Sequence, residues 1–156
     1  MSFKIESARR ADIPRLTDLL NDLFGVELDF TADSTRQVKG LELLIVDDDG
    51  PGERQTVAVA RDDSGQAIGM ASAQMVISTA EGALSAWIED VVVHHDYRRQ
   101  GIGKDLLAYL VAWAKARGAT RVQLIVDQEN EGADFFYKAL GWQSTQLMVR
   151  RRSTDS

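Results

Sequence analysis

A basic, glycine-rich corner between Val91 and Lys104 contains the residue types that bind phosphate groups in proteins. The valines at its start are typical of the end of a buried strand, and the apolar spacing after Ile102 predicts an amphipathic helix. Gly101 and Gly103 open this helix, where backbone N–H groups unshielded by a Cβ atom, together with the helix dipole, favour an anion. We therefore expect a phosphate site rather than a merely solvated turn, with added positive charge from Arg98, Arg99 and Lys104.

Two carboxylates stand in the apolar strand directly before this corner, in the order Trp87-Ile88-Glu89-Asp90-Val91. Burial of an unpaired carboxylate raises its pKa towards that of a useful general base. Alternation along a strand sends Glu89 and Asp90 to opposite faces, so one can support the structure or bind substrate while the other takes a proton. The alternative is that both carboxylates cap or pair with neighbouring chain.

The composition indicates one globular domain with an acidic surface. The chain has 156 residues, of which 44% are hydrophobic, enough for a single core. Its net charge of -6 argues against a general nucleic-acid binder, and the absence of cysteine excludes disulfides and thiolate chemistry. We expect a domain over residues 1–152 with a polar tail at 153–156, in a cytoplasmic protein without a signal peptide or a membrane span.

Hydrophobic spacing and turn residues predict the elements that hold these two features. Strand and helix patterns follow one another in the order β-α-α-β-β-β-α-β-α-β. The turn at 62–65 joins two antiparallel strands, and the strand-helix-strand order over residues 84–126 implies a parallel pair. The last helix is expected to start at an Asn130 cap and to end at Gly141. The sequence thus predicts an α+β fold with a mixed sheet.

Two motifs in this order match signatures of a known family. The first is Arg98-Arg99-Gln100-Gly101-Ile102-Gly103, and the second runs from Asn130 through Ala133, Phe136 and Tyr137 to Gly141 and Trp142. The first resembles the Arg/Gln-x-x-Gly-x-Gly/Ala loop of the GNAT superfamily of N-acetyltransferases, which cradles the pyrophosphate of acetyl-CoA. The second resembles that family's pattern Asn-x-x-Ala-x-x-Phe-Tyr-x-x-x-Gly-Phe. The resemblance implies the GNAT fold, a central mixed, mostly antiparallel twisted sheet of six to seven strands flanked by about four helices.

The resemblance also implies an activity, the transfer of acetyl from acetyl-CoA to a primary amine in a ternary complex, without a metal. An aliphatic amine with a pKa of about 10.4 is mostly protonated near neutral pH and must lose a proton before it attacks. In GNAT enzymes acting on polyamines and amino sugars, the first acid of a similar triplet contacts the amine. This favours Glu89 as the base and Asp90 as support. Tyr137 matches the tyrosine that protonates the departing thiolate, although a packed core tyrosine is the commoner role of a helical aromatic.

Acetyl-CoA is the implied cosubstrate, and its expected contacts fall in both motifs. Backbone N–H groups of the three valines resemble those that polarise the acetyl carbonyl in the family, where a strand bulge frees them from the sheet. Asn130 resembles the residue that hydrogen-bonds the pantetheine arm, though it could simply cap its helix. The residues expected to bind acetyl-CoA are Val91, Val92, Val93, Arg98, Arg99, Gln100, Gly101, Ile102, Gly103, Lys104, Asn130 and Phe136.

The acceptor is expected to be a small amine, such as a polyamine, an amino acid or an amino sugar, because the protein is acidic and offers a carboxylate pair. Glu27 and Asp29 are candidates for binding a cationic substrate, and ordinary loop charge explains them at least as well. Two alternatives stay open: acetylation of a protein N-terminus or lysine, and a noncatalytic acyl-CoA binding or sensor module. The two histidines, His94 and His95, lie in an expected solvent-facing turn and receive no catalytic role.

The end of the chain departs from the family pattern. Many GNAT domains place two strands after the Gly-Phe/Trp corner, whereas Trp142 to Arg151 is long enough for one. An unpaired sheet edge is a liability. We therefore expect a homodimer in which a strand at Thr145 to Val149 pairs with, or is exchanged into, a partner subunit. A single bent strand with a frayed tail is the alternative.

Overall fold

Five strands form one sheet, and each strand's neighbour in the sheet is also its neighbour in sequence. The strands are β1 (Lys4–Ser7), β2 (Gln55–Arg61), β3 (Ala67–Ser78), β4 (Ala83–Val93) and β5 (Ala119–Leu124). β1 to β4 pair antiparallel, and β4 pairs with β5 in parallel, which confirms the mixed sheet. The computed structural model describes residues 2–26 and 33–155, which belong to two compact units, residues 1–125 and residues 126–156.

Four helices and two short 3-10 turns accompany the strands in the described residues. The helices are α1 (Ile13–Val26), α2 (Ser34–Leu44), α3 (Ile102–Ala116) and α4 (Glu131–Ala139), and the turns are η1 (Arg10–Asp12) and η2 (His95–Tyr97). α2 begins at Asp33, whose carboxylate accepts hydrogen bonds from the backbone N–H groups of Thr35 and Arg36. The expected element order is therefore confirmed as far as α4.

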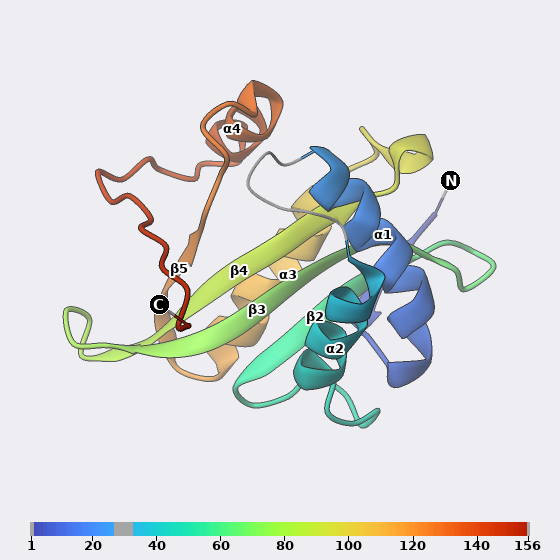
Figure 1. The fold of residues 1–156 in the computed structure, drawn as a ribbon, viewed down its shortest axis with the longest axis horizontal. Coiled ribbons are helices and arrows are strands. Elements are labelled where there is room, and N and C mark those ends of the chain that lie inside the picture. Colours follow the sequence, from blue (N-terminus) through green and yellow to red (C-terminus); the bar gives the residue numbers. More distant parts are fainter. Residues whose placement is uncertain (1, 27–32, 156) are drawn as a thin grey trace. The chain divides into compact units, whose positions relative to one another are not determined.

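Apolar side chains of the first unit pack on both faces of its sheet. In Figure 1, α1 and α2 lie in front of the sheet and α3 lies behind it. The front core joins leucines of the helices to alternate residues of the strands, namely Leu16, Leu19, Leu20, Leu41, Val57, Val59, Met70 and Val92. On the other face, Gly69 lets α3 approach closely, because a Cβ there would lie 3.2 Å from Ile102 Cγ2 and 3.4 Å from Leu106 Cδ1. The first turn of α3 is thereby held against β3.

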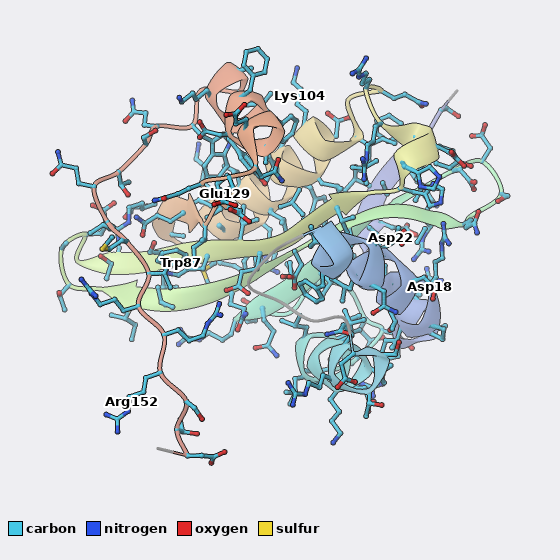
Figure 2. All side chains as sticks on the ribbon, turned by 45° about the horizontal axis from the view of Figure 1, so that its top comes forward. Asp18, Asp22, Trp87, Lys104, Glu129 and Arg152 are labelled. Carbon is cyan, nitrogen blue, oxygen red and sulfur yellow. The ribbon has the colours of Figure 1, made fainter. Side chains whose placement is uncertain are left out.

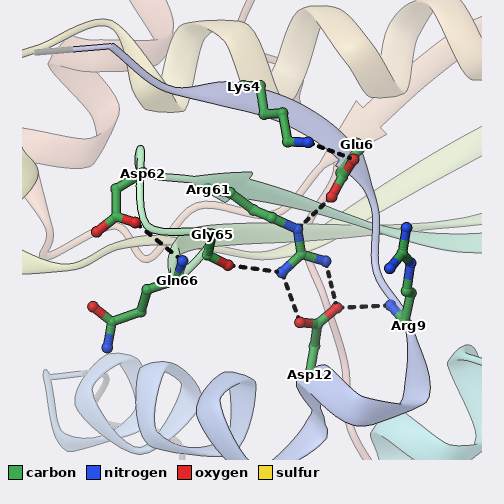
Figure 3. A network of polar contacts seen from close by, with 8 residues as sticks. All are labelled: Lys4, Glu6, Arg9, Asp12, Arg61, Asp62, Gly65 and Gln66. Atoms are coloured by element: carbon green, nitrogen blue, oxygen red, sulfur yellow. Dashed lines mark hydrogen bonds and ion pairs between the residues drawn. The ribbon is translucent and has the colours of Figure 1, made fainter.

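A buried arginine ties β1, β2 and η1 together (Figure 3). Arg61 is 8% exposed, and its guanidinium donates two 2.7 Å hydrogen bonds to the carboxylate of Asp12 and another to Glu6. Asp12 also accepts the backbone N–H of Arg9 at 2.7 Å. Burial raises the pKa of Asp12, but the hydrogen bonds from Arg61 and Arg9 outweigh it and leave that pKa lowered. The hydrogen bond from Arg61 likewise lowers the pKa of Glu6.

Replacement of Asp12 by asparagine is expected to lower the free energy of unfolding at pH 7 by about 3 kcal/mol, because it leaves the buried Arg61 charge partly unpaired. Both carboxylates have lowered pKa values in the folded state, so their contribution is complete above the unfolded-state values and is lost as the pH falls through the folded-state values. Urea titrations should therefore show the variant and the wild type converging in acid. Lys4→Gln, which removes an exposed 3.5 Å ion pair to Glu6, should change little. An Asp12→Asn deficit that persists undiminished in acid would contradict this assignment.

The expected sheet of six to seven strands is wrong, because the described residues form five. Residues 142–155 contain no strand, so the strand expected at Thr145 to Val149 is absent from the described part of the chain. Its apolar residues, Leu147 to Val149, are consecutive and exposed, and a run of this kind lacks the alternation that lets a strand bury one face. Arginines follow at 150–152. The hydroxyl of Thr145 instead accepts the backbone N–H of Leu147 in a local turn.

Candidate active site

An extra residue in β4 creates a bulge beside the carboxylate pair. Glu89 lies opposite Ser72 of β3, and Val92 lies opposite Met70, so three steps along β4 match two steps along β3. Asp90 takes up the difference with a φ of 57°, a left-handed conformation that non-glycine residues seldom adopt. The hydroxyl of Ser72 donates a 3.1 Å hydrogen bond to the backbone carbonyl of Glu89 on one flank of the bulge. The strand therefore changes direction just where its acidic residues lie.

A cleft of about 420 Å³ opens between the bulge and α2. Its volume falls in the range of small-molecule sites. It is lined by residues from one helix and three strands, namely Gly40, Leu43, Leu44, Gln55, Ser72, Gln74, Glu89 and Asp90. The bulge interrupts the strand alternation, so Glu89 and Asp90 both line this cleft, where an undistorted strand would have sent them to opposite faces. The cleft thus combines two carboxylates with amide and hydroxyl groups.

Glu89 is exposed in this cleft, and Asp90 is partly exposed. The apolar environment that the sequence led us to expect around Glu89 is therefore not present. Its immediate neighbours in sequence account for the difference, because Ile88 is 1% exposed and lies opposite Ala73, away from the cleft. Apolar residues that alternate with an acid bury the other face of the sheet and leave the acid in water.

β4 extends beyond its pairing with β5. The last matched residues are Ile88 of β4 and Leu124 of β5, where β5 ends. From Glu89 to Val93, β4 pairs with β3 on one side, and no residue of β5 pairs with it on the other side. The five residues that include the bulge therefore form an edge of the sheet at the point where the carboxylates meet the cleft.

The phosphate corner follows β4 through η2 and turns into α3. Arg99 has a φ of 63° and Gly101 a φ of 83°, and two left-handed residues so close together produce the sharp corner before the helix. Arg98 donates a 3.1 Å hydrogen bond from Nε to the carbonyl of Val93, which ties the corner to β4. Ile102 is 1% exposed and packs in the core, so it can meet a ligand only through its backbone. Lys104 projects from the first turn of α3 (Figure 2).

The two histidines stabilise the turn at the start of this corner. Nδ1 of His94 accepts the backbone N–H of Asp96 at 3.2 Å and so caps η2. The rings of His94 and His95 stack with centroids 4.3 Å apart, and Tyr97 meets His94 edge-on at 5.8 Å. These contacts are those of a structural turn.

The second unit, residues 126–156, contains the second motif. Oδ1 of Asn130 accepts the backbone N–H of Ala133 at 3.1 Å, so the predicted helix cap is confirmed. Tyr137 stacks edge-to-face with Phe136 at 5.1 Å and with Trp142 at 6.1 Å. The expected helix end is also confirmed, because Gly141 has a φ of 90° and its N–H bonds to the carbonyl of Lys138. The motif thus forms a capped helix whose aromatic side chains cluster on one side.

The structure brings Glu89, Asp90, the three valines and the phosphate corner together in the first unit, while Asn130, Phe136 and Tyr137 belong to the second. Glu27 and Asp29 lie outside the described residues. Three polar residues that line the cleft were not predicted from the sequence, namely Gln55, Ser72 and Gln74. One signal was available, since Ser72 and Gln74 alternate with alanines in an otherwise apolar strand.

Comparison with known proteins decides the family. Residues 14–142 match the acetyltransferase (GNAT) family, a span that covers both motifs and parts of both units. The chain belongs to the GNAT acetyltransferase family. No helix in the described ranges, 2–26 and 33–155, is long and apolar enough to cross a membrane.

Curated relatives of this GNAT chain match it over shorter stretches. An uncharacterized N-acetyltransferase of Methanocaldococcus jannaschii is 39% identical over 72 residues, 46% of this chain and 32% of the relative. An aminoglycoside N(6′)-acetyltransferase type 1 of Acinetobacter genomosp. 13 is 31% identical over 94 residues, 58% of this chain and 64% of the relative. The chain therefore spans from 32% to 64% of the length of these relatives.

Solved structures share the whole fold. The aminoglycoside N-acetyltransferase AAC(6′)-Iy, solved in complex with CoA, is 18% identical with a TM-score of 0.79. The match covers 98% of this chain and 95% of that chain. At this level of identity the likeness establishes the fold, and the GNAT fold predicted from the sequence is thereby confirmed.

Proposed function

We propose that the protein transfers an acetyl group from acetyl-CoA to a primary amine of a small molecule, by direct attack in a ternary complex. The observation that carries the proposal is the bulge in β4. At that point of the strand, the two-carboxylate cleft meets the edge that β5 leaves unpaired. A nucleophile held in the cleft and a thioester lying along the edge would meet there. Holding two reactants in this way supplies much of the catalysis of a bimolecular reaction.

The phosphate corner would bind the pyrophosphate of acetyl-CoA. Backbone N–H groups at Gly101 and Gly103 lie at the start of a 15-residue helix, where the dipole favours an anion. Arg99 and Lys104 are exposed and add charge. The backbone of Val91 to Val93 would polarise the acetyl carbonyl, and Asn130 with Phe136 would contact the pantetheine arm. The CoA complex of AAC(6′)-Iy supports this assignment by analogy of fold.

The chemistry requires two protons to leave the amine nitrogen and one to reach the departing sulfur. Glu89, directly or through a water molecule, would take a proton from the acceptor ammonium, and Asp90 would support it. The free amine attacks the thioester carbonyl, so that a C–N bond forms and the oxyanion is held by backbone N–H groups. Collapse then breaks the C–S bond, the attacking nitrogen releases its second proton to solvent to give the neutral amide, and the departing thiolate receives the proton of the Tyr137 hydroxyl. The base and Tyr137 are restored through solvent.

The acceptor would be a small cationic amine. A cleft of about 420 Å³ with two carboxylates suits a polyamine, an amino acid or an amino sugar. It suits a protein chain less well, because a protein acceptor needs a flatter and more open surface. The similar protein of Acinetobacter genomosp. 13 is named as an aminoglycoside N(6′)-acetyltransferase, which supports a small amine as the acceptor. Acetylation of a protein N-terminus or lysine, and binding of acyl-CoA without turnover, are the alternatives that the following experiment separates.

A thiol-release assay across polyamines, amino acids, amino sugars and short peptides, beside a CoA titration, tests the proposal. We expect amine-dependent release of CoA with small amines. Release of CoA with peptides alone would indicate that the acceptor is a protein. Tight binding of CoA without release from any amine would support the noncatalytic module, and failure to bind CoA would refute the assignment of the phosphate corner.

Replacement of Gly101 by alanine is expected to weaken CoA binding about tenfold, because the new Cβ disfavours the left-handed corner that presents the backbone N–H groups. The same strain should cost about 1 kcal/mol of stability. Gly118→Ala is the matched control, since Gly118 has a φ of 92°, also has open space around its Cβ position and lies at the other end of α3. The control should lose similar stability in a thermal melt and keep its affinity in a CoA titration. If Gly101→Ala and the wild type bound CoA with equal affinity, the corner would not be the CoA-binding site.

A further inference from the structure

A row of three amides and one indole crosses the sheet beside the cleft. Gln55 of β2 lies opposite Gln74 of β3, Gln74 lies opposite Trp87 of β4, and Trp87 lies opposite Gln123 of β5. Residues directly opposite one another on neighbouring strands point to the same face of a sheet. We call Gln55, Gln74, Trp87 and Gln123 the glutamine row. It places four side chains with hydrogen-bonding or stacking surfaces side by side.

The glutamine row shares a face with Glu89. The next row on the same face lies two residues further along each strand and consists of Val57, Ser72 and Glu89. Val57 packs in the core under α1 and α2. Gln74 and Ser72 both line the acceptor cleft. Since the bulge begins only after Glu89, the alternation from Trp87 to Glu89 is undisturbed. Trp87, marked on β4 in Figure 2, therefore stands roughly 7 Å from Glu89 along the strand, on the side of the cleft.

The row remains accessible. Gln74 is exposed, and Gln55, Trp87 and Gln123 are partly exposed. Trp113 offers a contrast, because it is 4% exposed and its indole N–H donates to the carbonyl of Gly52 at 2.9 Å. Gln55 is held in one orientation by the hydrogen bond from its Nε2 to the carbonyl of Leu43 at 2.8 Å. A partly exposed indole opposite the cleft-lining Gln74 is a stacking surface available to a ligand.

The row has no charge, and this restricts the acceptor. Glu89 and Asp90 provide negative charge at one end, whereas the row after the glutamines contains Arg121, which donates to the hydroxyls of Ser85 and Ser78. An extended polyamine long enough to pass the glutamine row, roughly 13 Å from Glu89, would carry its far ammonium towards that arginine. An uncharged ring bearing hydroxyl groups meets no such repulsion, since each amide offers both donors and an acceptor to hydroxyls and the indole covers the C–H face of a ring.

We propose that the glutamine row is the subsite for the sugar ring of the acceptor, so that the enzyme acetylates an amino sugar whose amine lies at Glu89 and whose ring stacks on Trp87. This inference rests on the proposed acetyl transfer and names its substrate class. Trp87 and Gln74 would set specificity for the ring, while the bulge and its carboxylates serve any amine.

Acceptor kinetics with glucosamine and with the acyclic diamine putrescine test this subsite. We expect a higher kcat/KM for glucosamine in the wild type. Trp87→Ala should raise the KM for glucosamine about tenfold, which corresponds to the loss of roughly 1.4 kcal/mol of stacking. The kcat, the KM for putrescine and the Kd for CoA should not change. Trp87→Phe keeps an aromatic face and should recover part of the loss, and Gln74→Ala should act in the same direction. Ile77→Ala, which removes a 77% exposed side chain from the opposite face of β3, is the control.

A direct titration of glucosamine into the CoA-bound protein separates this inference from the proposed function. Weaker glucosamine binding by Trp87→Ala, even without turnover, would support the ring subsite. Equal losses for glucosamine and putrescine would reduce Trp87 to a packing residue and overturn the subsite, while the acetyltransferase assignment would stand. A wild type that prefers putrescine would overturn it as well. Absence of turnover with every amine would refute the proposed function alone, provided that Trp87-dependent binding is still seen.

Discussion

Replacement of Glu89 by glutamine is expected to reduce kcat by about a hundredfold to ten-thousandfold, the range for loss of a general base, without changing the Kd for CoA. The amide keeps the shape of the side chain but cannot take the proton that the acceptor ammonium must lose. Glu89 is exposed in the cleft wall, so the substitution disturbs no buried contact. Steady-state thiol release with a saturating small amine, beside a CoA titration, measures both quantities.

Two further variants serve as a control and as a test of which carboxylate is the base. Glu81→Gln makes the same chemical change in the turn of the β3–β4 hairpin, beyond the ends of the cleft-lining strands, and should leave kcat as it is. Asp90→Asn should have a smaller effect than Glu89→Gln if Asp90 supports the base. Loss of turnover in Asp90→Asn alone would assign the base to Asp90. Full activity in both variants would mean that neither carboxylate takes the proton.

Local chemistry explains the parts of the fold that the sequence predicted correctly. Asn130 caps the start of α4 because its side-chain oxygen accepts the backbone N–H three residues later. Gly141 ends the helix because a residue without a Cβ adopts the left-handed conformation there at little cost. The turn at 62–65 joins β2 to β3 for a similar reason, since the carboxylate of Asp62 accepts the N–H groups of Ser64 and Gln66. Such features depend on a few neighbouring residues, and the sequence contains them all.

The errors and omissions concern the way in which distant segments meet. Alternation placed Glu89 and Asp90 on opposite faces, but one inserted residue against Met70 and Ser72 brought both into one cleft. The cleft that Glu89 lines is formed by α2 and three strands, which no spacing within β4 describes. The glutamine row appears only once the register of four strands is known. The missing strand after α4 has the same origin, since a strand needs a partner edge as well as β-forming residues.

Replacement of Tyr137 by phenylalanine is expected to reduce kcat by about a hundredfold, with little effect on the Kd for CoA. The ring stays in place, so its edge-to-face contacts with Phe136 and Trp142 survive and α4 keeps its packing. What disappears is the hydroxyl that would protonate the departing thiolate. Thiol release and CoA titration measure the two effects. Tyr109→Phe removes a phenol from α3 instead and should leave turnover unchanged.

The pH dependence of the Tyr137→Phe defect tells proton donation from packing. A free thiol has a pKa of about 8.5, so the thiolate of CoA needs no proton to leave the reaction once the pH is well above that value. The ratio of wild-type to variant kcat should therefore shrink as the pH rises through about 8.5. A defect in packing would lower kcat and CoA affinity together and would keep the same size across this range. Only the first pattern makes the Tyr137 hydroxyl the acid of the reaction.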